Sequence, residues 1–119
     1  AYLDSLGWVH YKLGDFDQAE HWLVMAVGQS NGRDPEILDH LGDTYYRKDR
    51  QQAAVALWRR IEQLTQLYQQ YANDESLTAI AARARQKTQA IEQDEPVPVA
   101  ALGEGVKLKP PKELPAGAQ

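Results

Sequence analysis

The sequence predicts an all-α protein built as a helix-turn-helix repeat array, an α-solenoid, and two observations lead to this prediction. Apolar and small residues between Leu38 and Ile61 recur at spacings of three and four, as they do on one face of a helix. A shift of 35 residues also superposes identical residues at packing positions. Leu3, Asp4, Leu6, Gly7, Tyr11 and Ala19 meet Leu38, Asp39, Leu41, Gly42, Tyr46 and Ala54. Such a period is typical of paired-helix repeats.

Residues 1–33 form the first predicted unit. Its first helix runs from about residue 1 to 13 and ends at Gly14-Asp15, where glycine suits the left-handed conformation that closes a helix. Its second helix covers about residues 16–29, and a loop rich in turn-forming residues follows.

Residues 34–72 form the second predicted unit. Asp34 and Pro35 open its first helix as an acidic cap followed by proline in the first turn. Its second helix begins near residue 51, and its apolar stripe continues through Tyr68 and Tyr71, so we expect an extended helix. Gly42 is small enough to let the two helix backbones approach closely.

These residues resemble the tetratricopeptide repeat, whose pattern is W-x2-L-G-x2-Y, A-x3-F, P. The Leu-Gly pair and the alanine are present in both units, and Asp49 stands where the first unit has Gly14. The resemblance covers about residues 1–64 and implies antiparallel helix pairs that bind proteins. The chain also resembles the terminal repeats of large bacterial multi-repeat proteins. Because Ala1 already lies within a helical pattern, we interpret the chain as the C-terminal end of a longer protein.

Residues 73–93 are predicted to form a C-terminal capping helix, with Asn73 or Asp74 as its N-cap. Its inner face comprises Leu77, Ile80, Ala81, Ala84, Thr88 and Ile91, and its outer face comprises Arg83, Arg85, Gln86 and Lys87. Residues 94–119 form a tail rich in proline and glycine. Two interpretations stay open: a flexible tail, or an extended segment, about residues 97–108, that lies along the helices or a neighbouring molecule.

The resemblance also implies a binding surface, since the first helix of each unit lines the concave side of such arrays. By pattern match the residues on this side are Asp4, Trp8, Tyr11, Lys12, Asp39, Asp43, Tyr46 and Arg47. Aromatic anchors beside charges suit peptide recognition. The alternative is a solvated face, or one that the tail covers. Because the carboxylates here repel other carboxylates, we do not expect an acidic chaperone tail as ligand.

Composition argues against several other classes of protein. The net charge of -4 and pI near 5.3 argue against a nucleic-acid partner. No apolar run approaches the roughly 20 residues of a membrane span. The three histidines lack metal-ligand spacing, and no phosphate loop or catalytic triad is evident, so we expect no catalytic residue, metal or cofactor. His10 replaces a packing tyrosine and is expected to be a hydrogen-bonded interior histidine.

The glutamines at positions 63, 66, 69 and 70 indicate a solvated face on the second helix of unit two; a coiled-coil seam is the alternative. The sequence therefore predicts a non-catalytic protein-protein interaction module that binds a peptide or protein segment on its concave face. The alternative is a structural end of an array, which packs on upstream repeats or self-associates through its N-terminal edge. That edge comprises Tyr2, Leu3, Leu6 and Val9.

Overall fold

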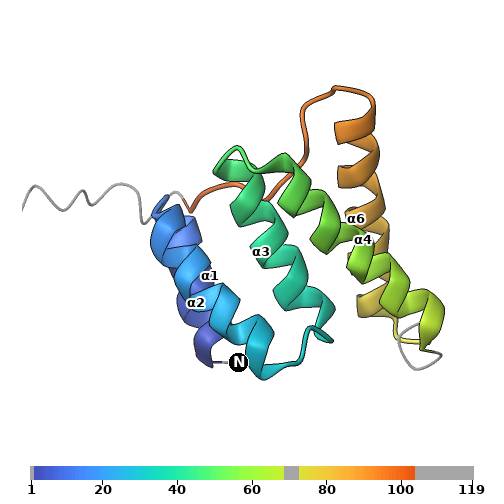
Figure 1. Ribbon diagram of the computed structural model, residues 1–119, viewed down its shortest axis with the longest axis horizontal. Coiled ribbons are helices and arrows are strands. Elements are labelled where there is room, and N and C mark those ends of the chain that lie inside the picture. The colour runs from blue at the N-terminus through green and yellow to red at the C-terminus, as the bar shows by residue number, and fades with distance from the viewer. Residues whose placement is uncertain (1, 69–72, 104–119) are drawn as a thin grey trace, which may run out of the picture.

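The structure is a computed structural model that describes residues 2–68 and 73–103, and it is all-α (Figure 1). Within these residues it has five helices: α1 (Tyr2–Lys12), α2 (Phe16–Gln29), α3 (Pro35–Arg47), α4 (Gln51–Leu67) and α6 (Glu75–Glu92). Helix α1 packs on α2, α3 packs on α4, and α6 packs on α4 in antiparallel succession. The predicted fold class, a helical repeat array, is confirmed. No helix in the described part of the chain is long and apolar enough to cross a membrane.

Short polar side chains begin three of the helices. Asp15 accepts a hydrogen bond from the Gln18 amide, and Asp34 accepts one from the Glu36 amide at 3.0 Å. Asp74, rather than Asn73, caps α6. These carboxylates satisfy amides that have no partner within the first helical turn, and they lie at the positive end of the helix dipole.

The turn inside each helix pair has the same backbone conformation. Gly14 has a φ of 83° between α1 and α2, and Asp49, 35 residues later, has a φ of 62° between α3 and α4. The absence of glycine at position 49 therefore does not change the turn, because aspartate also tolerates the left-handed region.

Helix α4 ends earlier than its apolar stripe predicts. Its last residue is Leu67, and Tyr68 is already extended. Ile61 and Leu64 are fully buried, whereas Leu67 and Tyr68 are largely exposed. Tyr68 is the C-cap and lies just beyond the helix, so its predicted place in the helical stripe is wrong. Helix α4, with 17 residues, is nevertheless longer than its counterpart α2, with 14; Tyr71 lies outside the described residues.

Close packing at a glycine recurs in both helix pairs. A Cβ atom on Gly7 would lie 2.7 Å from the Leu23 side chain, and one on Gly42 would lie 3.0 Å or less from three atoms of the Trp58 indole. Leu23 and Trp58 are fully buried and stand 35 residues apart. The repeat seen in the sequence is therefore a repeat of interhelical contacts.

Two apolar clusters form the core. The first lies among α3, α4 and α6 and includes Leu38, Ala54, Trp58, Ile61, Leu64, Ile80, Ala84 and Val97. The second lies among α1, α2 and α3 and comprises Tyr11, Ala19, Leu23 and Leu41.

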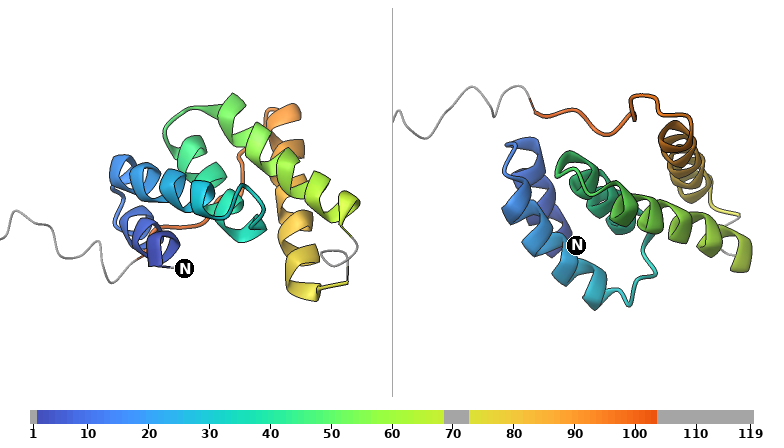
Figure 2. Two further views of the ribbon diagram at one scale, coloured as in Figure 1. Left: turned by 60° about the horizontal axis from the view of Figure 1, so that its bottom comes forward. Right: turned by 45° about the horizontal axis from the view of Figure 1, so that its top comes forward.

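After α6 the chain turns back and crosses α3 to reach α1, as Figures 1 and 2 show. Val97 is buried in the first core cluster, and Ala100 and Leu102 pack against the second. We call residues 97–103 the docked segment. For these residues the structure agrees with the interpretation in which the tail lies along the helices; residues 104–108 of that prediction fall outside the described part.

Candidate protein-binding groove

The groove that holds the docked segment is formed by the inner faces of α1 and α3. Tyr11 and Lys12 end α1, and Asp43 and Arg47 are one helical turn apart on α3. Residues four apart lie on the same side of a helix, so the two α3 side chains point toward the same stretch of the docked segment. The segment crosses these helices near their C-terminal ends (Figure 2).

The main chain of Ala100 is held at both of its polar groups. Its carbonyl oxygen accepts hydrogen bonds from the Tyr11 hydroxyl at 2.6 Å and from Arg47 Nη2 at 2.7 Å. Its amide donates to Asp43 Oδ2 at 3.0 Å. Arg47 Nε also donates to the Tyr11 hydroxyl at 3.0 Å, which orients both donors. We call Tyr11, Asp43 and Arg47 the main-chain clamp; it contacts atoms that every peptide presents.

Lys12 adds a second attachment beside the clamp. Its Nζ donates to the carbonyl oxygen of Ala101 at 3.0 Å, and its own carbonyl accepts from the Gly103 amide at 3.0 Å. The C-terminal end of α1 has carbonyl groups without intrahelical partners, so the Gly103 amide satisfies one of them. The docked segment thus also caps the C-terminal end of α1.

A buried ion cluster lies beneath the clamp. Lys87 Nζ, on α6, lies 2.8 Å from Asp39 Oδ1 and 2.7 Å from Asp43 Oδ1, and Arg83 lies 3.6 Å from the other oxygen of Asp39. Burial, together with the nearby charge of Asp39, raises the pKa of Asp43 above its ordinary value. We call Asp39, Asp43 and Lys87 the ion cluster; it joins α3 to α6.

The prediction that Lys87 lies on the outer face of its helix is wrong, because Lys87 is only 3% exposed. It follows Ala84 by three residues and therefore lies on the buried side of α6. The two carboxylates of α3 offset the cost of burying its ammonium group. Lys87 and Arg83 together balance the charge of the two carboxylates.

An aromatic stack continues the groove toward the start of α1. The Trp8 ring stacks with the ring of Tyr11, at 4.3 Å, and with the ring of His40, at 3.8 Å. Nδ1 of His40 lies 2.8 Å from Asp4 Oδ1, an interhelical contact between α1 and α3. Asp4 and Trp8 thus fix His40 beside the groove.

A cavity of about 240 Å³ remains between this stack and the docked segment. It is lined by Trp8, Asp39, His40, Asp43, Arg83, Lys87, Pro98 and Ala100. The lining combines aromatic rings with side chains that already have ionic partners.

Comparison with known proteins identifies the first helix pair. Residues 1–27 match the family model described as tetratricopeptide repeat. This stretch is a tetratricopeptide repeat. Searches among curated proteins and among solved structures found no match to the chain. The chain is thus a helical repeat protein, and its repeat implies a protein-interaction scaffold in general, of a kind that is typically non-catalytic.

The tetratricopeptide repeat contributes Asp4, Trp8, Tyr11 and Lys12 of the predicted binding residues. Of the eight, the structure brings four into contact with the docked segment: Tyr11, Lys12, Asp43 and Arg47. Trp8 and Asp39 line the cavity, and Asp4 bonds to His40. Tyr46 instead packs against the first core cluster, 6.4 Å from the Trp58 ring.

Sequence reasoning did not place Lys87, Arg83 or His40 at the groove. One signal for Lys87 was present, because its position continues the buried stripe of α6 and two acids on α3 needed a cation. His10 was expected to be a hydrogen-bonded interior residue, and its side chain is 26% exposed with a buried Nδ1. That Nδ1 lies 3.8 Å from Asp15 and makes no hydrogen bond with the described residues, so the predicted hydrogen bond is wrong.

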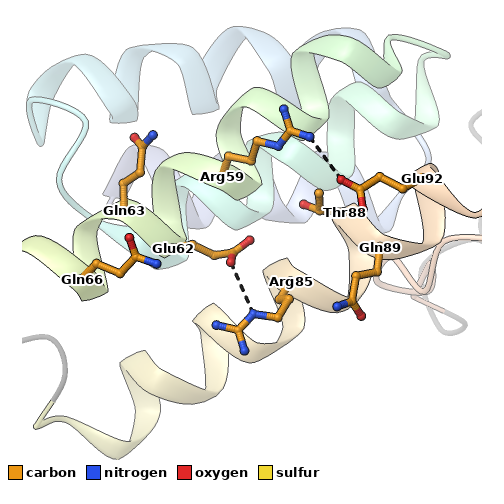
Figure 3. A pocket seen from close by; sticks show the side chains of 8 residues that line it. All are labelled: Arg59, Glu62, Gln63, Gln66, Arg85, Thr88, Gln89 and Glu92. Atoms are coloured by element: carbon orange, nitrogen blue, oxygen red, sulfur yellow. Dashed lines mark hydrogen bonds and ion pairs between the residues drawn. The ribbon is translucent and has the colours of Figure 1, made fainter.

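A second groove, of about 430 Å³, lies between α4 and α6 (Figure 3). Two ion pairs span it, Arg59 with Glu92 at 3.3 Å and Arg85 with Glu62 at 3.4 Å. Its charged side chains partner one another, and Gln63 and Gln66 are exposed. These features agree with a solvated face in the part of α4 that the structure describes; Gln69 and Gln70 lie outside it.

Proposed function

We propose that this chain is a non-catalytic interaction module that binds an extended segment of another protein in its concave groove. The observation that carries the proposal is the main-chain clamp, which holds both polar groups of Ala100 in the docked segment. The groove thereby accommodates a non-helical polypeptide segment, which turns at Pro98, where the Val99 amide donates to the Val97 carbonyl at 2.8 Å. Peptide recognition of this kind derives affinity from main-chain hydrogen bonds and selectivity from the pockets beside them.

The clamp is suited to strong binding because two of its three side chains are charged. Hydrogen bonds in which one partner is ionised are about twice as strong as neutral ones. Tyr11 is buried, and burial raises the pKa of its hydroxyl to about 12. Its hydroxyl therefore stays protonated at neutral pH and can donate to a carbonyl group.

We also propose that residues 34–72 form a second unit of the same kind and that residues 73–93 are the capping helix. The matching contacts of Gly7 with Leu23 and of Gly42 with Trp58 support this division. Asp49 supports it further, since it has the backbone conformation of Gly14.

The test has to allow for competition by the docked segment. A clamp mutation weakens the binding of the docked segment and the binding of an incoming peptide alike. In the unmodified chain the two effects on the measured peptide affinity therefore partly cancel. We therefore define an opened variant, Val97→Asp with Leu102→Asp, which places charges where the docked segment is packed against the core. Both changes lie outside the helices.

Peptides selected from a display library against the opened variant should bind at least tenfold more weakly after Arg47→Ala. Arg59→Ala is the matched control, because Arg59 lies on the exposed face of α4, in the groove between α4 and α6. Isothermal titration gives both affinities. Equal affinities for the Arg47 and Arg59 variants would refute groove binding.

A second candidate function is docking of another helix pair on the outer edge of α1. Tyr2 is 76% exposed and Val9 53% exposed, whereas their repeat equivalents, Ile37 and Thr44, are 5% and 0% exposed. The preceding helix pair covers those equivalents, so the same face of α1 fits a further helix pair, from an upstream repeat or a second copy. Light scattering at increasing concentration, with Val9→Lys as the variant, tests self-association; a monomer throughout would contradict it.

A further inference from the structure

The docked segment fills its groove only in part. Pro98 and Ala100 border the cavity of about 240 Å³ beside Trp8 and His40, and neither side chain reaches across it. Val97 and Leu102, in contrast, pack against the core clusters. The segment is therefore well held at its main chain and its ends, and poorly fitted at its centre.

We propose that the natural partner of this groove is an extended, uncharged segment of another protein that displaces residues 97–103 and inserts an aromatic side chain into this cavity. The inference rests on the proposed function. It adds that the incoming segment has an aromatic side chain, which the docked segment lacks.

A partner needs such an advantage because the docked segment is covalently attached. A short flexible tether gives an attached ligand an effective concentration in the millimolar range. The tether here is residues 93–96, which follow α6 and include Asp94 at a φ of 57°. An incoming segment that made only the same main-chain contacts would therefore lose the competition at ordinary concentrations.

An aromatic side chain supplies the advantage. Burial of a large apolar side chain tightens binding by about tenfold to a hundredfold. The rings of Trp8 and His40 form part of the wall, and aromatic rings pack favourably against other rings. The cavity thus favours one bulky ring at the place of Pro98 or Ala100.

A charged side chain would not fit as well. The ionised groups on the cavity wall are already paired, Lys87 with Asp39 and Asp43, and Arg83 with Asp39. A further charge would lose part of its hydration and would have to compete with these ion pairs for a partner. Residues 96–103 themselves have no charged side chain. The clamp and the cavity together select an uncharged extended segment.

The experiment uses labelled eight-residue peptides and fluorescence anisotropy. One peptide has the sequence of residues 96–103, Pro-Val-Pro-Val-Ala-Ala-Leu-Gly, and others have Phe, or as controls Lys or Glu, at the positions of Pro98 or Ala100. We expect the opened variant to bind the native-sequence peptide and at least one Phe peptide about tenfold more tightly, with no gain from Lys or Glu. The unmodified chain should bind every peptide at least tenfold more weakly than the opened variant.

The outcomes separate the two proposals. If the native-sequence peptide binds but no Phe peptide binds more tightly, the proposed partner is wrong and groove binding stands. If no peptide, including the library-selected ones, binds a helical and monomeric opened variant, the proposed function itself fails. If instead the opened variant or the unmodified chain exchanges segments and dimerises, the occupant is a second copy, and the proposed partner is again wrong.

A measurement on the unmodified chain covers the case in which the opened variant loses its helices. At millimolar Phe peptide, the amide resonances of Ala100 and Gly103 should move to the positions of a disordered chain, while those of the helices change little. Unchanged resonances of both amides at saturating peptide would overturn displacement.

Discussion

Replacement of Lys87 by methionine should strongly destabilise the fold, since it removes the cation of the ion cluster and keeps the length of the side chain. The side chains of Lys87, Asp39 and Asp43 are all at least nine-tenths buried. Removing one partner of a buried ion pair costs about 3–5 kcal/mol, because the remaining charge is left without compensation. For a domain of this size that loss lowers the melting temperature by roughly 12 °C or more.

The pH dependence of this variant has a defined sign. Burial and the charge of Asp39 raise the pKa of Asp43, so the folded chain holds this proton to higher pH than the unfolded chain does. Between the ordinary pKa of aspartate and the raised one, the free energy of unfolding falls as pH rises. Without the ammonium group of Lys87 the pKa of Asp43 rises further. The loss in the free energy of unfolding caused by Lys87→Met should therefore be largest at neutral pH and shrink toward pH 4.

Urea unfolding followed by circular dichroism at pH 7 and pH 4 measures both effects. Arg85→Met is the matched control on the same helix, because the Arg85 side chain is 60% exposed and its ion pair with Glu62 contributes less than about 1 kcal/mol. Lys87→Met combined with Asp39→Asn and Asp43→Asn should recover much of the loss. A loss below about 1 kcal/mol at pH 7, without pH dependence, would refute a buried ion cluster.

Three further changes test the packing and the turns. Gly42→Ala should destabilise the chain by about 1–3 kcal/mol, because the added methyl group would overlap the buried Trp58 ring. The control is Gly28→Ala, which should be neutral or slightly stabilising because the space around Gly28 is open. Urea unfolding compares the two variants. Asp49→Gly should raise the free energy of unfolding by up to about 1 kcal/mol, since glycine adopts the left-handed conformation without strain, and a decrease would contradict the turn. The hydrogen bond with Lys48 lowers the pKa of Asp17, so Lys48→Met should raise that pKa. The free energy of unfolding should then fall less steeply as the pH decreases. An unchanged pKa of Asp17 in an NMR titration of the variant would exclude this contact.

The helix pairs could be predicted from the sequence because their signals are local. Spacing of apolar residues, the caps at Asp34 and Asp74, and the glycine at position 14 act within a few residues of one another. The close approach at Gly42 was also predictable, because its repeat equivalent, Gly7, has the same role.

The groove was predictable only in part because its contacts join distant parts of the chain. Tyr11 and Ala100 are 89 residues apart, and no local pattern indicates that a proline-rich segment supplies a carbonyl group to a helix. Lys87 was missed for a related reason. Its burial depends on two carboxylates from another helix, and an isolated lysine is ordinarily assigned to the surface.

The measurement to make first is a nuclear Overhauser spectrum of the unmodified chain, directed at contacts between the Tyr11 ring and residues 100–102. If the groove holds an extended segment as described, cross-peaks should connect that ring to Ala100 and Leu102, and the Ala100 amide should exchange slowly with solvent. Random-coil shifts for residues 97–103, with a rapidly exchanging Ala100 amide and no cross-peaks to Tyr11, would contradict it.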